Sequence, residues 1–165
     1  MSTRAVVCLC VALAACVPAI SAVAADDRMT TRLATCQDSW LDWKDDPLLG
    51  QKFVGAFRAA FTQKDKEPYF VPKTALTVAG LRVERAFPES VGMGVGFSVV
   101  VNAGFDATRK AVEKEIGKTL PHCETSDGMR TCELDIAPRR SLTVMADDKP
   151  RSKSTLIGCF YFYAK

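Results

Sequence analysis

Four cysteines follow an N-terminal apolar segment, and they constrain this fold more than any other feature of the sequence. Residues 1–24 have the form of a secretory signal peptide, with Arg4 near the start, an apolar stretch from Ala5 to Cys16, and a small-residue cleavage site at Ala22-Val23-Ala24. Exported chains fold where thiols are oxidised, so an even number of cysteines predicts disulfides. The four are Cys36, Cys123, Cys132 and Cys159. Residues 25–165 are expected to form a single domain.

A membrane helix and a lipid anchor are the alternatives for the N-terminal segment. Pro18 interrupts the apolar run, which is also poor in Leu, Ile and Phe, so a cleaved signal peptide is favoured over a spanning helix. Leu13-Ala14-Ala15-Cys16 is similar to a bacterial lipoprotein box, in which Cys16 would carry the lipid. An ordinary cleavage site follows this box, so we expect an exported protein that touches a membrane only if Cys16 is lipidated.

The pairing of the cysteines follows from a predicted β-hairpin. Asp127-Gly128 is typical of a two-residue hairpin turn, and counting outward from it places Cys123 directly opposite Cys132. The pair falls at a non-hydrogen-bonded position, where Cα atoms approach to about 4.5 Å, at the short end of disulfide geometry. By elimination, Cys36 pairs with Cys159 and joins the first helix to the last strand.

Hydrophobic spacing predicts three helices. Apolar residues at helical intervals indicate a first helix that carries Cys36 on its buried stripe and continues to Trp40 and Trp43. Asp46-Pro47 begins a second helix, which ends near Lys64. A third helix is expected to begin with Asp106 as its N-cap and to stop at Gly117.

Alternating apolar residues predict strands between and after these helices. A strand from Leu76 to Val83 would need a bulge near Ala79-Gly80 to keep its apolar side inward. The later strands are roughly Val95–Val101, Arg130–Ile136, Ser141–Ala146 and Thr155–Tyr163. The last is apolar on both faces and should be central. The order predicts an α+β fold, with a mainly antiparallel sheet of about five strands packed with N-terminal helices and one inserted helix.

Composition and spacing exclude several classes of function. Across 165 residues, 22 Lys and Arg stand against 19 Asp and Glu, and the basic residues form no block, so no nucleic-acid partner is expected. His122 is the single histidine, and neighbours on a strand point to opposite faces, so it cannot act with Cys123 as a nucleophilic pair. A single histidine also argues against a metal site. Glu84 and Glu133 are expected on strand faces that contact solvent, which accounts for these acids without a catalytic role. We therefore expect no enzyme activity, no cofactor and no metal.

The general plan of the chain resembles a known group of proteins. It combines Leu13-Ala14-Ala15-Cys16, a small disulfide-bearing α+β domain and the terminal strand Cys159-Phe160-Tyr161-Phe162-Tyr163. This plan is similar to that of the small periplasmic immunity proteins that Gram-negative bacteria make against secreted antibacterial effectors. The resemblance implies a periplasmic protein that binds and blocks an effector such as a cell-wall hydrolase or phospholipase, and it assigns no contact residue. The alternatives are a carrier of a lipid or small ligand, with a deep apolar pocket, and an envelope hydrolase, with acids converging in a cleft.

Two loops have the makeup of a docking site for a protein. Pro88–Gly94 presents Met93 between Gly92 and Gly94, and an inhibitor that plugs an active site needs a protruding loop of this kind. Asp147–Lys153 offers charges that can steer a partner. Its candidate contact residues are Asp147, Lys149 and Arg151. We favour the Met93 loop, with the helix bearing Trp40 and Trp43 as the next candidate; the alternative is that both loops are only connections.

Overall fold

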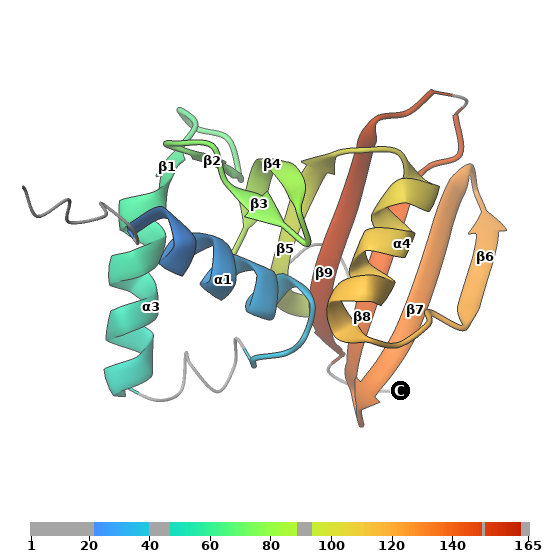
Figure 1. Ribbon diagram of the computed structural model, residues 1–165, viewed down its shortest axis with the longest axis horizontal. Helices are drawn as coiled ribbons and strands as arrows, with labels where there is room; N and C mark the ends of the chain where they lie inside the picture. The colour runs from blue at the N-terminus through green and yellow to red at the C-terminus, as the bar shows by residue number, and fades with distance from the viewer. Residues whose placement is uncertain (1–21, 40–46, 89–93, 150, 163–165) are drawn as a thin grey trace, which may run out of the picture.

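The computed structural model describes residues 22–39, 47–88, 94–149 and 151–162, which form an α+β fold with two disulfides (Figure 1). Its helices are α1 (Ala22–Ala34), α3 (Pro47–Ala60) and α4 (Phe105–Ile116). Its strands are β1 (Phe61–Gln63), β2 (Phe70–Pro72), β3 (Thr77–Val78), β4 (Leu81–Phe87), β5 (Gly94–Asn102), β6 (His122–Ser126), β7 (Met129–Ala137), β8 (Arg140–Asp147) and β9 (Ser154–Phe162). Helix α1 begins within the segment expected to be a signal peptide, whose cleavage stays a prediction.

The sheet is mainly antiparallel and has nine strands, not about five. Eight of them lie in the order β1-β2-β4-β5-β9-β8-β7-β6, and β3 pairs with β4. As predicted, β9 is central, because β5 and β8 pair along its two sides. The unpredicted strands β1 and β2 are only three residues long, which is too short for an alternating pattern to show. The single strand predicted from Leu76 to Val83 is divided between β3 and the start of β4.

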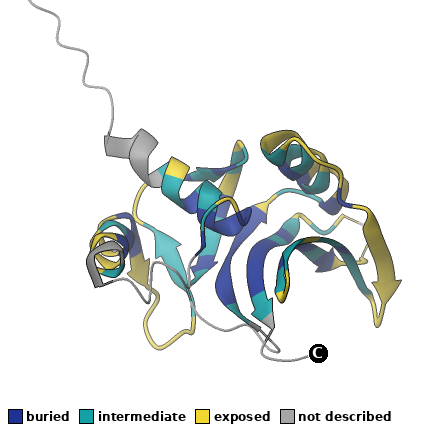
Figure 2. Ribbon diagram, turned by 90° about the horizontal axis from the view of Figure 1, so that it is seen from below, coloured by how far each residue is buried: buried dark blue, intermediate teal, exposed yellow. Residues whose placement is uncertain are grey.

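Helices α1 and α4 cover the same face of the sheet, as Figures 1 and 2 show. Alternate residues of the central strands point to that face and are buried beneath the helices. They are Phe97, Val99 and Val101 of β5, Ile157 and Cys159 of β9, and Leu142 and Val144 of β8. Helix α3 adds Phe53 and Phe57, whose ring centroids each lie 6.3 Å from that of Phe97 in edge-to-face geometry. The core therefore lies between the helices and the middle of the sheet.

The first helix is shorter than predicted. It ends at Ala34, and Cys36 follows in the left-handed region with φ 57°. The backbone N–H groups of Gln37 and Asp38 both donate to Arg32 O, which closes the end of the helix. Arg32 also donates to both carboxylate oxygens of Asp38 at 2.6 Å, and this contact raises the pKa of Arg32. Cys36 is therefore in the turn after the helix rather than on its stripe, and Trp40 and Trp43 lie outside the described residues.

Two further details correct the predicted elements. Ala79 and Gly80, with φ 51° and 76°, form a two-residue turn between β3 and β4 instead of a bulge. Asp106 lies in the first turn of α4, whose N-cap is Gly104 without a side-chain capping bond. Gly117, with φ 68°, ends α4 as predicted.

Candidate functional site

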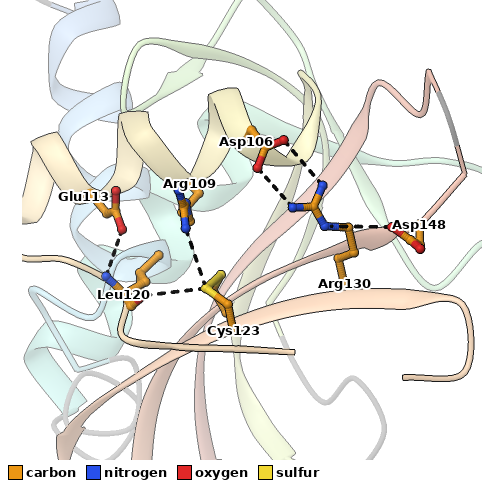
Figure 3. Close-up of a disulfide and its surroundings, with 8 residues drawn as sticks. Asp106, Arg109, Glu113, Leu120, Cys123, Arg130 and Asp148 are labelled. Atoms are coloured by element: carbon orange, nitrogen blue, oxygen red, sulfur yellow. Dashed lines mark hydrogen bonds and ion pairs between the residues drawn. A yellow bond between two sulfur atoms is a disulfide. The ribbon is translucent and has the colours of Figure 1, made fainter. Parts of the chain in front are cut away.

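The two disulfides have the predicted partners. Cys36 and Cys159 are joined across 123 residues, with a Cα–Cα distance of 5.0 Å, and both are buried. Cys123 and Cys132 are paired opposite each other in the hairpin, with a Cα–Cα distance of 4.0 Å. Cys132 is fully buried, whereas Cys123 is exposed and lies 3.9 Å from the Arg109 guanidinium (Figure 3). Two disulfides indicate a protein that folds in an oxidising compartment.

The two predicted docking loops lie at opposite ends of the sheet. The loop after β4 enters β5 at Gly94, which pairs with Phe162, whereas the loop after β8 enters β9 at Ser154. These ends are separated by the length of β9, about 27 Å at the usual rise of a strand. Gly92 and Met93 lie outside the described residues, so the structure places only the edge of the first loop. The described ends of the two loops are therefore too far apart to belong to one compact patch.

The β8–β9 loop is held in place by Arg130 of β7 (Figure 3). The Arg130 guanidinium lies 3.1 Å from Asp106 of α4 and 3.8 Å from Asp148, and it stacks 4.4 Å from the ring centroid of Phe105. The backbone N–H of Asp148 donates to Gly128 O at 2.8 Å. One side chain thus joins the start of α4, the β6–β7 hairpin and the β8–β9 loop.

The charged side chains of this loop point to solvent. Asp147, Lys149 and Arg151 are exposed, and Lys149 lies 3.6 Å from Asp147. Exposed ion pairs contribute little to stability, so these charges remain available to a partner. Their binding role stays a prediction.

Replacing Arg130 by glutamine is expected to loosen the β8–β9 loop without unfolding the domain. The carboxylates that pair with Arg130 are 63% exposed for Asp106 and 48% exposed for Asp148, so the free energy of unfolding should fall by no more than about 1 kcal/mol. Amide hydrogen exchange at Asp148 should accelerate, because its bond to Gly128 O depends on the position of the loop. Lys149→Met, which removes only a solvent-exposed pair, is the control and should leave this exchange unchanged. Equal exchange in both variants would contradict the role of Arg130.

A second feature lies on the face of β6, β7 and β8 that points away from the helices. Because Cys132 and Val144 point toward the core, their strand neighbours point to the opposite face. We call this set the acidic face: His122, Glu124, Ser126, Met129, Thr131, Glu133, Asp135, Ser141, Thr143, Met145 and Asp147. It contains four carboxylates and, at these positions, no lysine or arginine. Asp135 accepts a hydrogen bond from Ser141 and Asp147 lies near Lys149, which leaves Glu124 and Glu133 as its main charges.

A groove of about 390 Å³ opens at the edge of the acidic face. It is lined by Pro121, His122, Cys123, Glu124, Thr131 and Glu133. His122 lies opposite Glu133 in the β6–β7 register, and Glu124 is the next residue along β6 on the same face. Sequence reasoning explained Glu133 and His122 separately and missed this arrangement, although the register counted from Asp127-Gly128 already places them side by side.

Strand β6 forms a free edge of the sheet. All five of its residues are exposed, and β7 is its one partner strand within the described part of the chain. In the register set by the turn, Glu124 and Thr131 exchange backbone hydrogen bonds, whereas Cys123 and Thr125 fall at non-hydrogen-bonded positions. The N–H and C=O groups of Cys123 and Thr125 therefore point outward, away from β7.

The described residues contain another groove, of about 560 Å³, between β2 and β4. Its charged lining residues are Lys73, Arg82 and Glu84, and Lys73 Nζ already donates to Arg58 O at 2.5 Å. No group of three or more potential metal ligands occurs in the described ranges. No described helix has the length and apolar character needed to cross a membrane.

Comparison with known proteins does not assign the chain to a family. No family model, no curated protein and no solved structure matches it.

Proposed function

We propose that this chain is an exported, non-enzymatic binding protein that neutralises a secreted antibacterial effector, such as a cell-wall hydrolase or phospholipase, in the periplasm. The observation that carries this proposal is the Arg130 contact network, which holds the charged β8–β9 loop against a disulfide-bonded hairpin. A binding surface that is ordered before it meets its partner loses less conformational entropy on association. Exposed charges of the kind found on this loop also accelerate encounter with an oppositely charged partner.

The two alternatives have less support. A carrier needs an apolar cavity, whereas the two grooves described above have charged linings and are open to solvent. The convergence of Glu124 and Glu133 favours a hydrolase, but a general acid needs a carboxyl group that is shielded from water, and Glu124 is exposed. If the protein had a hydrolytic activity, Glu133→Gln would therefore be expected to leave that activity unchanged.

Reversing the charges of the β8–β9 loop should weaken the complex with the effector. Effectors secreted by the same cell are produced one at a time with the protein in the periplasm, and the one whose toxicity it suppresses is purified with it. The variant Lys149→Glu with Arg151→Glu should then bind at least about tenfold more weakly, equivalent to about 1.4 kcal/mol, with most of the change in the association rate.

The control for this experiment is Lys52→Glu on α3, which reverses the charge of an exposed lysine outside the loop. It should leave affinity and toxicity suppression unchanged. If no secreted effector is suppressed by the protein, the proposed function is wrong. If suppression occurs but the loop variant binds like Lys52→Glu, the function stands and the loop is not its contact surface.

A further inference from the structure

We infer that the free edge of β6 takes up an extended, basic segment of a protein partner as an added β-strand. This inference deepens the proposed function and rests on it for the identity of the partner. Addition of a strand satisfies the outward N–H and C=O groups of an exposed edge, and the flanking side chains determine which sequence is accepted. The edge, its rigidity and its charge each support this mode of binding.

The edge of β6 is accessible to solvent along its whole length. The outward backbone groups belong to Cys123 and Thr125, and all of β6 is exposed. Natural sheets protect such an edge with a proline, a bulge, a covering segment, charged side chains or a very short strand. The sequence of β6 contains no proline, its pairing with β7 has no register shift, and no other described element covers it. Its protection is limited to its length of five residues and the charge of Glu124, and edges whose backbone groups are accessible are the usual sites of strand addition.

The edge is also fixed in an extended conformation before any partner binds. The Asp127-Gly128 turn closes one end of the hairpin, and the Cys123–Cys132 disulfide ties the strands near the other end. An incoming segment therefore orders only itself, which reduces the entropy lost on binding.

On the face that points away from the helices, the charge of the neighbouring side chains favours a basic occupant. On the other face of the hairpin, Arg109 lies beside Cys123 and Arg130 lies opposite Thr125. On the acidic face, Glu124 projects from β6 itself, and Glu133 lies on the same face of β7, opposite His122; all three line the groove. A segment with Lys or Arg at alternate positions would place its cations along this row, since alternate residues of a strand share one face. A second copy of this chain would instead bring the same carboxylates against one another, which disfavours edge-to-edge self-association.

The experiment uses the oxidised protein and a fluorescent synthetic peptide of alternating Thr and Lys, about ten residues long. Binding is measured by anisotropy at low ionic strength, because the attraction is screened by salt. The decisive variant is Thr125→Pro: proline removes one outward N–H yet is tolerated on edge strands, so the bonds to β7 are kept. Thr125→Ala keeps the N–H and is the matched control. Melting temperature is recorded for each variant to verify that the fold is intact.

Thr125→Pro should weaken peptide binding by at least about tenfold, whereas Thr125→Ala should bind like the parent protein. A peptide with Glu in place of Lys should not bind, and Glu124→Gln with Glu133→Gln should weaken binding of the Lys peptide. Backbone amide shifts on binding should centre on Cys123 and Thr125. Equal binding by the proline and alanine variants, equal binding of both peptides, or shifts centred elsewhere would each overturn the inference.

A further arm separates this inference from the proposed function. If Thr125→Pro still suppresses the effector as well as Thr125→Ala does, the function survives and strand addition is wrong. If the peptide behaves as expected but no effector is suppressed, the edge binds basic segments and the proposed function fails. Concentration-dependent dimers that Thr125→Pro abolishes would identify a second copy as the occupant and would also overturn the inference.

Discussion

Replacing Cys36 and Cys159 together by alanine is expected to lower the free energy of unfolding by about 5 kcal/mol. The disulfide closes a loop with a sequence separation of 123, and in the chain-entropy model a loop of this size restricts the unfolded chain by about that amount. The melting temperature should fall by about 10–20 °C for a domain of this size. Urea unfolding of the oxidised protein and of the variant measures the difference directly.

The control is the same replacement at Cys123 and Cys132. That disulfide spans a separation of only 9, so the model gives a smaller loss of about 3 kcal/mol. If the two double variants lost equal stability, the long loop would not be the reason for the effect.

Phe97→Ala should produce the next largest loss, about 3–5 kcal/mol. Phe97 is fully buried in β5, and its ring meets those of Phe53 and Phe57, so truncation leaves a cavity where α3 packs on the sheet. Phe53 and Phe57 are buried residues of α3, so hydrogen exchange within this helix should rise in the variant.

Two controls accompany this measurement. Phe97→Leu retains much of the buried volume and should lose less stability than Phe97→Ala. Val54→Ala on α3 truncates a residue that is 43% exposed and should change stability by no more than about 0.5 kcal/mol. A loss at Val54 comparable with that at Phe97 would mean that the packing of α3 differs from the one described.

The parts of the fold that were predictable are those with a strong local pattern. Asp127-Gly128 fixes the register of its hairpin, and from it the Cys123–Cys132 pair follows by counting. The apolar character of both faces of β9 predicted its central place between β5 and β8.

The remaining features depend on tertiary contacts that leave no local pattern. Cys36 has a left-handed backbone where glycine or asparagine is usual, and its disulfide to Cys159 holds it there. Ala79 likewise adopts a positive φ in a turn that normally requires asparagine, aspartate or glycine at that position. Neither position could therefore be recognised as the end of a helix or as a hairpin turn.

The candidate site was predictable in part. The charged character of the β8–β9 loop could be predicted from its sequence. Its attachment through Arg130 could not, because it depends on contacts with Asp106 and Asp148, which are far apart in the sequence. Part of the acidic face could have been predicted from the sequence, because the hairpin register places His122 opposite Glu133. What sequence could not show is that α1 and α4 both pack on the opposite face of the sheet.

The position of β9 determines the order in which the molecule can be completed. Of the described strands, β9 is the last along the chain, yet it lies between β5 and β8. As the chain is delivered from its N-terminus, the β4–β5 and β6–β7–β8 hairpins can form early because their contacts are local, while the two halves of the sheet stay apart. During the same interval Cys36 lacks its native partner, Cys159, whereas Cys123 and Cys132 have already been delivered and could react with it. Early closure of the hairpin disulfide removes both wrong partners before Cys159 arrives, so the short disulfide protects the correct formation of the long one.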